Sequence, residues 1–293
     1  MTRTGAELTV REAAIRGTRM RWLYAPCTGS PVLYVHGVPD EGSMWTPFLK
    51  RTGGLAPDLP GFGSSAKPRH YPYGIAQVAD QLEGLLDHLQ IDRFRLVVHD
   101  WGGAALALAQ RIPDRVERLV IIDALPLLPG YHWHRIARVW RTPLAGELFM
   151  ALTTRKALRF ISREAYAAKG PLPDAFLERA WSHFDGDTRR AILRLYRSAP
   201  EEMLAGYGDR LGRITAPTLV LWGERDPYVP ASFADAYAQA IPNATLQRIA
   251  DASHWCWIDR PDLIGQVTDF LNSDTHPTGQ TLNNHPTQET AVR

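Results

Sequence analysis

Val97-Val98-His99-Asp100-Trp101-Gly102-Gly103 is the stretch of sequence that decides the fold of this chain. The apolar run that ends at Val98 predicts a buried strand, and the small and apolar residues from Gly102 to Leu106 predict the start of a helix. A strand that runs directly into a helix needs a tight turn, and Asp100 occupies that turn. A side chain on such a turn is held out at the edge of a sheet, where it can meet a bound molecule.

The side chain at this turn is a carboxylate, and that limits the chemistry. An aspartate is already ionised at neutral pH, because its reference pKa is about 3.9, so it needs no base to activate it for a first attack. Serine is the usual residue on a turn of this kind, and its absence disfavours serine-type acyl transfer. We therefore expect Asp100 to attack a carbon atom that carries an epoxide oxygen or a halogen.

Composition and charge exclude several classes of protein. The chain has 293 residues, with 33 lysines and arginines against 31 aspartates and glutamates, which gives no electrostatic case for a nucleic acid or an anionic membrane as partner. Cys27 and Cys256 form neither a disulfide framework nor a metal-binding spacing. The N-terminus lacks a signal-peptide pattern, and no run approaches the ~20 apolar residues of a membrane span. We expect a cytoplasmic protein, of an oligomeric state that the sequence does not determine.

Strand and helix signals alternate along most of the chain. Short apolar or alternating segments predict strands at residues 8–15, 20–25, 31–35, 94–98, 119–123, 217–222 and 244–249. The apolar residues from Ile75 to Leu89 recur at helical spacing and predict a helix. Arg16-Gly17-Thr18 suits a hairpin turn. The alternation predicts an α/β fold with a mostly parallel central sheet that helices flank on both faces.

One region interrupts this alternation. Residues 127–213 hold helical segments rich in arginine, leucine and aromatic residues and broken by prolines, and they predict a helical cap inserted between two strands. The core is then expected in two parts, residues 1–126 and 214–271. Residues 272–293 are polar without periodicity and predict a disordered tail.

Two further residues complete a constellation with Asp100. Asp226 directly follows the predicted strand at residues 217–222, and His254 follows the one at residues 244–249. Open α/β sheets keep their sites at the carboxyl ends of the strands, so these side chains are expected at one edge. The chain order nucleophile, acid, histidine marks α/β-hydrolases. Here His254 would take a proton from water, while Asp226 would fix its tautomer and stabilise the imidazolium.

A set of short motifs carries a resemblance to a known family. They are His36-Gly37-Val38-Pro39, Asp58 to Ser65, His99 to Gly103, Gly223 to Asp226, and His254-Trp255 followed by Asp259 and Pro261. Together they are similar to the epoxide hydrolase and haloalkane dehalogenase branch of the α/β-hydrolase superfamily, over most of the chain outside the cap. The resemblance implies the α/β-hydrolase fold with an inserted helical cap, and catalysis with no cofactor and no metal.

The resemblance also implies an oxyanion hole formed by the backbone N–H groups of Val38 and Trp101. Two preorganised donors would stabilise the tetrahedral step of ester hydrolysis by several kcal/mol, since the loss of one such donor costs about 10²- to 10³-fold in rate. A cis peptide bond before the proline of this motif is common in the family, which points to Pro39.

Residues around the site bear on the choice between an epoxide and a haloalkane. Halide release needs the indole N–H of Trp101 and a second donor, yet Val38 occupies the position where many dehalogenases carry Asn or Glu. Epoxide opening needs a donor for the leaving oxygen, and Tyr196 resembles the second ring-opening tyrosine of epoxide hydrolases in context and position. Phe149 falls near the position of the first such tyrosine, and Tyr131 is a loose substitute for it.

We therefore expect an epoxide hydrolase that forms a vicinal diol from a small apolar epoxide and water. Phe149, Tyr131 and Trp255 are expected to line the substrate pocket. A haloalkane dehalogenase that uses the same Asp100 nucleophile is the alternative. A non-catalytic binder of small molecules is the third interpretation.

Several of these residues also have simpler interpretations. Asp123, after the strand at residues 119–123, is the rival of Asp226 for the role of the acid. Tyr196 lies among apolar residues and would equally suit a packed helix face. His132 and His134 have no third ligand in view, so we expect exposed cap residues rather than a metal pair.

Overall fold

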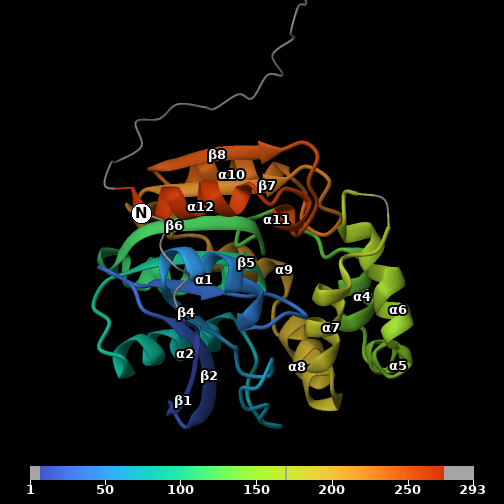
Figure 1. Ribbon diagram of the computed structural model, residues 1–293. Coiled ribbons are helices and arrows are strands. Elements are labelled where there is room, and N and C mark those ends of the chain that lie inside the picture. Colours follow the sequence, from blue (N-terminus) through green and yellow to red (C-terminus); the bar gives the residue numbers. More distant parts are fainter. Residues whose placement is uncertain (1–6, 169, 274–293) are drawn as a thin grey trace, which may run out of the picture.

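The computed structural model describes residues 7–168 and 170–273, which form an eight-stranded sheet flanked by helices (Figure 1). The strands are β1 (Thr9–Ile15), β2 (Thr18–Ala25), β3 (Val32–Val35), β4 (Gly54–Pro57), β5 (Phe94–Asp100), β6 (Val116–Ala124), β7 (Thr218–Gly223) and β8 (Ala244–Ile249). Their order across the sheet is β1-β2-β4-β3-β5-β6-β7-β8. β2 pairs antiparallel with β1 and β4, and the remaining pairs are parallel. The predicted α/β-hydrolase fold with a mostly parallel sheet is confirmed.

Two details of the sheet follow from short sequence signals. Arg16 and Gly17 have φ values of 48° and 79°, so the predicted hairpin between β1 and β2 closes through a turn with two left-handed residues. β4 was not predicted, because its four residues are too short to show a period of two. It lies between β2 and β3, where it changes the sheet from antiparallel to parallel pairing.

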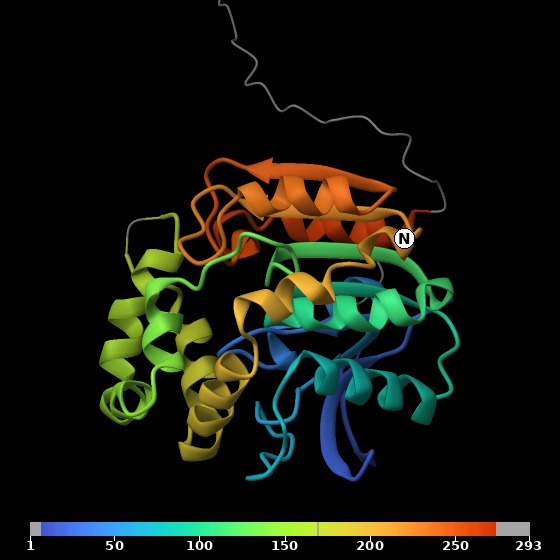
Figure 2. The ribbon, with the colours of Figure 1, turned by 180° about the vertical axis from the view of Figure 1, so that it is seen from behind.

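Helices cover both faces of the sheet, because successive residues of the central strands point to opposite sides. Val98 belongs to the apolar cluster under the helices that face the viewer in Figure 2, which are α2 (Ile75–His88), α3 (Leu106–Arg111) and α10 (Ser232–Ala240). Val97 belongs to the cluster under the opposite helices, which are α1 (Thr46–Thr52), α11 (Cys256–Asp259) and α12 (Leu263–Asn272). A slip by one residue would exchange the two faces, so burial on both sides fixes the register of the strands.

Six further helices come between β6 and β7. These inserted helices are α4 (Arg135–Arg141), α5 (Ala145–Leu152), α6 (Arg155–Ile161), α7 (Asp174–Ser182), α8 (Gly186–Arg197) and α9 (Glu201–Tyr207), counted over the described residues. Figure 1 shows α4 to α8 on the side of the molecule to which the arrowhead of β8 points. The helical character of this region agrees with the sequence, while the division into a core and a cap at residues 127 and 213 stays a prediction.

The predicted tail at residues 272–293 stays a prediction, because almost all of it lies outside the described residues. Helix α12 continues to Asn272, so the expected boundary at residue 272 lies inside the last turn of a helix. Residues 274–293 lie outside the described part of the chain. Of the described helices, none combines the length and the apolar character that crossing a membrane would require.

Candidate active site

Asp100 ends β5 and lies on a strained turn. Its φ of 49° is in the left-handed region, and the chain continues directly into a 3₁₀ turn at Trp101–Ala105. Two glycines make room for it. A Cβ atom on Gly37 would lie 2.3 Å from Asp100 Oδ2, and one on Gly102 would lie 2.2 Å from the Val35 carbonyl oxygen. Any larger residue at either glycine would therefore displace the turn.

Backbone amides hold one oxygen of the Asp100 carboxylate. Oδ2 accepts a hydrogen bond from the Val38 N–H at 2.7 Å, and the Trp101 N–H also faces the carboxylate. These are the two donors that the sequence predicted for an oxyanion hole. The Val38–Pro39 peptide bond is cis. Burial raises the pKa of Asp100 to about 6, against the effect of the amides and of His254, which lower it.

His254 lies between two carboxylates. Its Nδ1 donates to Asp226 Oδ2 at 2.7 Å, and its Nε2 lies 3.9 Å from Asp100 Oδ1. The other oxygen of Asp226 accepts from the N–H groups of Tyr228 and Val229, at 2.7 and 3.0 Å. Burial lowers the pKa of His254, but the charges of Asp226 and Asp100 outweigh this and raise it overall. The sheet thus brings Asp100, Asp226 and His254 together at its edge.

Asp123, the rival acid, lies at the end of the neighbouring strand and makes different contacts. Its Oδ1 accepts from the Gly223 N–H at 2.8 Å, and the Cys256 thiol also interacts with this carboxyl group. Burial and the charge of Asp226 raise the pKa of Asp123 well above its ordinary value. The hydrogen bond from His254 goes to Asp226, so Asp123 is left as a buried acid that favours its protonated form.

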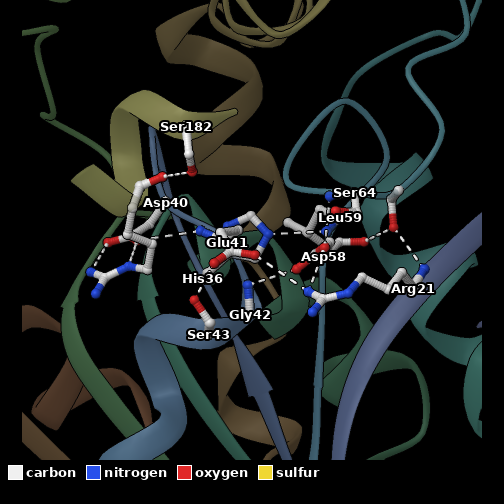
Figure 3. Close-up of polar contacts among 12 residues, drawn as sticks. Arg21, His36, Asp40, Glu41, Gly42, Ser43, Asp58, Leu59, Ser64 and Ser182 are labelled. Atoms are coloured by element: carbon white, nitrogen blue, oxygen red, sulfur yellow. Dashed lines mark hydrogen bonds and ion pairs between the residues drawn. The ribbon is translucent and has the colours of Figure 1, made fainter. Parts of the chain in front are cut away.

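A buried network of charged groups holds the loop that carries Val38 (Figure 3). Arg21 Nη1 lies 3.1 Å from Asp58 Oδ2 and 3.4 Å from Glu41 Oε2. The other oxygen of Asp58 accepts from the Gly42 N–H at 2.9 Å. Burial and the charge of Asp58 raise the pKa of Glu41 to about 7. The network joins β2 to the loops after β3 and β4, which fixes the backbone next to the Val38 amide.

Two buried histidines use their rings to bind backbone groups. His36 Nδ1 donates to the Gly37 carbonyl at 2.8 Å, and its Nε2 accepts from the Leu59 N–H at 3.0 Å. His99 Nε2 donates to the carbonyl of His254 at 2.9 Å. Burial lowers the pKa of both rings, so both favour the neutral form. They support the loop of Val38 and the backbone of His254.

One buried ion pair links the inserted helices to the same loop. Arg179 of α7 donates through Nε to Asp40 Oδ1 at 2.7 Å and through Nη2 to Oδ2 at 3.3 Å. Asp40 follows the cis Pro39 directly and is almost fully buried. The position of α7 is therefore coupled to the loop that carries the Val38 amide.

Asp100 and His254 open into a cavity of about 80 Å³ with a mainly apolar lining. Phe149 and Trp255, two of the three residues expected around the substrate, lie in its lining, and so does Tyr196. The Tyr196 ring packs edge-on against the Trp101 indole, with 5.0 Å between their centres. Burial and the charge of Asp100 raise the pKa of Tyr196 well above its ordinary value.

Trp101 lies beneath this cavity rather than in its wall. Its indole stacks on Trp133 with 5.6 Å between ring centres, and it is not among the cavity-lining residues. The indole nitrogen is buried without a well-formed hydrogen bond, although the Tyr196 hydroxyl lies close enough to interact with it. Of the Trp101 donors, the backbone N–H is the one that faces Asp100.

Two of the expectations for aromatic and histidine residues need correction. Tyr131 does not line the cavity: its ring packs between Trp133 and Phe233, and its hydroxyl donates to the Tyr228 carbonyl at 3.4 Å. His134 was expected to be exposed, but it is largely buried and does line the cavity. It is the N-cap residue that directly precedes α4, and its side chain accepts a hydrogen bond from the Ala137 N–H.

Among the cavity-lining residues that sequence reasoning missed are His134 and Tyr228, whose rings carry polar groups. The Tyr228 ring packs edge-on against His254, with 5.1 Å between centres. For Tyr228 a signal was present, because it follows Asp226 by two residues. For His134 no local signal separated it from the exposed His132, which pairs with Glu201. Within residues 7–168 and 170–273, no group of three or more His, Cys, Asp or Glu side chains has an arrangement that could hold a metal ion.

The cavity continues into an open groove between inserted helices. Ile136, Phe149 and Ile161 line both hollows, so the two spaces adjoin. The groove is also lined by Val139 and by Phe160, whose side chain is largely exposed. The groove and the cavity that holds Asp100 are therefore separated by no more than these three side chains.

Known proteins are similar to this chain in sequence and in fold. A family model described as the alpha/beta hydrolase fold matches residues 30–261. The haloalkane dehalogenase of Mycolicibacterium paratuberculosis is 32% identical over 285 residues, which cover 89% of this chain and 89% of that protein.

Two solved structures have a similar fold at lower sequence identity. Haloalkane dehalogenase DbeA from Bradyrhizobium elkani has a TM-score of 0.76 and 24% identity, covering 90% of this chain and 98% of that one. The epoxide hydrolase CorEH has a TM-score of 0.78 and 23% identity, covering 90% of this chain and 99% of that one. At these identities the two structures support the fold alone.

Proposed function

Because the chain belongs to the alpha/beta hydrolase family, with haloalkane dehalogenases and an epoxide hydrolase among the proteins it resembles, we propose that it hydrolyses epoxides to vicinal diols through an ester on Asp100. The arrangement at Asp100 carries this proposal. One carboxylate oxygen is 2.7 Å from the Val38 N–H, and the other is 3.9 Å from His254 Nε2. The first oxygen suits the carbonyl of an ester, and the second is free to attack carbon.

In the first step, Asp100 Oδ1 forms a bond to an epoxide carbon while the carbon–oxygen bond of the ring breaks. The electron pair of that bond moves to the leaving oxygen, which takes the proton of Tyr196. The high pKa of Tyr196 keeps its proton available in the free enzyme. Because Oδ2 already accepts from the Val38 N–H, ester formation through Oδ1 needs no rearrangement of the carboxylate.

In the second step, His254 takes a proton from water as the water attacks the ester carbonyl. Esterification removes the negative charge of Asp100, which is one of the charges that raise the pKa of His254. His254 therefore becomes more strongly biased toward the neutral base at the step that needs it, while Asp226 stabilises the imidazolium. The amides of Val38 and Trp101 stabilise the oxyanion. The tetrahedral intermediate then collapses, and the bond between the carbonyl carbon and the substrate oxygen breaks. The departing alkoxide takes the proton from the His254 imidazolium and leaves as the diol. The carboxylic acid proton that remains on Asp100 passes to the phenolate of Tyr196, which restores both groups.

The residues 127–213 are the cap of this proposed enzyme. They supply Tyr196, Phe149 and most of the apolar side chains around Asp100. An apolar lining of this kind suits a small apolar substrate and limits the water near the carboxylate.

The surroundings of Asp100 favour an epoxide over a haloalkane. Tyr196 offers a proton to a leaving oxygen, whereas a halide leaves without one. The Val38 side chain donates nothing, and the indole of Trp101 is outside the cavity lining. A halide would therefore lack the pair of side-chain donors that stabilises it.

Haloalkane dehalogenation is the second candidate. It is favoured by the relative that is 32% identical and by the Trp101 indole N–H, which lacks a well-formed hydrogen bond. Displacement would follow the same route, with carbon–halogen bond cleavage and release of a halide in place of an alkoxide.

The test is to trap the ester. The variant His254→Gln, incubated with a panel of epoxides and bromoalkanes, should gain the mass of an epoxide on the peptide that contains Asp100. Adding Asp100→Asn to that variant should abolish the adduct. Wild-type protein should release diol, and Tyr196→Phe should slow diol formation without slowing bromide release. Adducts from bromoalkanes alone would establish the dehalogenase, and the absence of any adduct would overturn both candidates.

A further inference from the structure

Opening an epoxide creates an alkoxide, and a single donor leaves that charge poorly stabilised in an apolar cavity. Tyr196 is the donor that the sequence predicted, and its expected partner is missing. Phe149 lines the cavity but has no polar hydrogen, and the Tyr131 hydroxyl is directed to the Tyr228 carbonyl away from the lining. A second donor has to come from another residue.

We propose that His134 is this second donor, and that its Nε2–H binds the leaving oxygen together with the hydroxyl of Tyr196. The inference rests on the function proposed above and assigns a further catalytic residue to it. It turns a histidine that the sequence suggested was exposed into part of the reaction site.

The contacts of His134 determine which ring nitrogen carries the proton. His134 is the N-cap residue of α4, and its Nδ1 accepts a hydrogen bond from the Ala137 N–H at 3.4 Å. A nitrogen that accepts has no proton, so the neutral ring has its proton on Nε2. This Nε2–H makes no hydrogen bond with the described residues. The residue itself lines the apolar cavity, so this donor is available to a bound molecule there.

The surroundings of His134 keep its ring neutral. Burial lowers its pKa to about 3, and the nearby His254, Arg135 and Arg138 act in the same direction. An imidazolium at this position would pair with the Asp100 carboxylate and weaken it as a nucleophile. A neutral N–H donor stabilises the alkoxide without that penalty. Burial therefore sets the protonation state of His134, and the neighbouring positive charges reinforce it.

His134 and Tyr196 reach the cavity from different inserted helices. Their rings meet at 87°, with 6.3 Å between centres, and both residues line the cavity with Asp100. The Tyr228 hydroxyl also belongs to the lining, but its ring packs edge-on against His254, the base of the second step. His134 is therefore the better partner for Tyr196 in the first step.

The two residues have different roles: Tyr196 transfers its proton to the leaving oxygen, and His134 keeps its proton. During ring opening the electron pair of the broken carbon–oxygen bond goes to oxygen, which then takes the Tyr196 proton. The Nε2–H of His134 stays on nitrogen and only donates a hydrogen bond. Loss of His134 should therefore slow ester formation and leave ester hydrolysis unchanged.

Rapid-mixing measurements of the two steps test this. His134→Phe should slow ester formation from epoxides by about 10²-fold, as expected for one donor at a developing oxyanion. The matched control is His132→Phe, which alters an exposed histidine two residues away and should leave both steps unchanged. Equal loss in both steps, or an equal effect of His132→Phe, would overturn the assignment.

His134→Asn separates donation from helix capping. Asparagine can cap α4 in place of histidine but is too short to reach the leaving oxygen. We expect wild-type thermal stability and the slow ester formation of His134→Phe. Recovery of the wild-type rate would show that His134 acts as a cap only, and would overturn the proposal.

A measurement without turnover distinguishes this inference from the proposed function. A small secondary amide can direct its N–H to Asp100 and its carbonyl to the two donors. Calorimetry should show about tenfold weaker amide binding for His134→Phe and for Tyr196→Phe, but unchanged binding for Tyr228→Phe. If the amide bound in this way but the wild-type protein opened no epoxide, His134 and Tyr196 would be supported as a pair of donors, and the proposed epoxide hydrolysis would be rejected. Unchanged amide binding in His134→Phe would reject the donor even where epoxides are turned over.

Discussion

The edge of the sheet and the inserted helices meet at Asp100, and they hold their side chains in different ways. At the sheet edge, Asp226 and His254 are fully or almost fully buried and have direct hydrogen bonds to backbone or to each other. Among the inserted helices, charged pairs such as Arg159 with Asp174 are largely exposed, and the apolar side chain of Phe160 faces solvent. Buried hydrogen bonds fix geometry far more firmly than exposed ion pairs do.

The sheet edge therefore holds its side chains in a fixed geometry, while the side chains of the inserted helices can adapt to different molecules. The sheet edge positions the attacking carboxylate and the base for water, which any substrate would need. The inserted helices supply Tyr196, His134 and the apolar walls, which determine the leaving group and the substrate shape. Substitutions at the sheet edge should therefore affect every substrate alike, and substitutions in the helices should affect substrates unequally.

The largest effect is expected from removing the acid of the sheet edge. Asp226→Asn should slow ester hydrolysis by about 10⁴-fold, because the tautomer of His254 would no longer be fixed for accepting a proton. Ester formation should change little. Asp123→Asn is the control, and rapid-mixing measurements of both variants should show less than about tenfold loss for it. If Asp123→Asn produced the larger loss, Asp123 and not Asp226 would be the acid.

The second effect concerns the link between the two regions. Arg179→Met would leave the buried Asp40 carboxylate without its partner and should destabilise the protein by about 3 kcal/mol. Arg159→Met removes an exposed pair in the same set of helices and should cost less than about 1 kcal/mol. Thermal unfolding of the two variants gives the comparison. Equal losses would mean that the inserted helices are not anchored through Asp40.

The third effect is a gain in stability at the site itself. Burial raises the pKa of Asp100 from 3.8 to about 6, so the folded protein binds a proton here more tightly than the unfolded chain does. Stability from this group is therefore present at low pH and is lost as the pH rises through 6. Asparagine has no carboxyl group to ionise, so Asp100→Asn avoids the cost of a buried charge. The variant should be more stable than the wild type at pH 7 by roughly 1–3 kcal/mol. Unfolding measured below pH 4 should show little difference, and a gain that persisted there would refute this origin.

The fourth effect is the pH dependence of the first step. Because the pKa of Asp100 is about 6, the rate of ester formation should fall about tenfold per pH unit below that value. His254 lowers the pKa of Asp100, so in His254→Gln the fall should begin at higher pH. Single-turnover rates against pH check both points. An unchanged profile in His254→Gln would show that a different group causes the fall.

The smallest effect is expected at the groove. Phe160→Asp should raise KM for long-chain epoxides by about three- to tenfold, because each buried methylene contributes about 0.8 kcal/mol to binding. Short epoxides, which fit within the cavity, should keep their KM. Phe160→Leu is the control and should preserve the preference. Steady-state kinetics over a series of chain lengths provides the measurement, and equal effects on short and long epoxides would show that the groove takes no part in binding.

The sequence predicted the sheet edge, because the strands and the turn that form it are determined by short local segments. The buried runs before Asp100, Asp226 and His254 and the glycines around the turn are local signals, and parallel pairing then brings the three residues to one edge. The same physics explains why the acid stayed undecided. Asp123 lies near the end of β6 and Asp226 follows the neighbouring β7, and the contacts that distinguish them, above all the hydrogen bond from His254, come from distant segments.

The sequence predicted that the inserted region is helical, but it did not predict which of its side chains face the cavity. His132 and His134 are separated by one residue, yet one is exposed and the other lines the cavity. Likewise Tyr131 was a reasonable donor by position, but packing against Phe233 turns it away. Side-chain direction here depends on contacts with distant segments, and helical periodicity carries no information about them.

The stacked indoles of Trp101 and Trp133 give the protein an optical property. They lie in contact, at 5.6 Å between ring centres and 15° between planes, and Tyr196 packs against both. Coupled indoles at a fixed angle absorb circularly polarised light unequally, and their emission responds to a charge that forms nearby. Binding and ring opening at Asp100 should therefore be visible in the near-ultraviolet dichroism and fluorescence of the unlabelled protein. The chain carries its own spectroscopic reporter beside the reacting atoms.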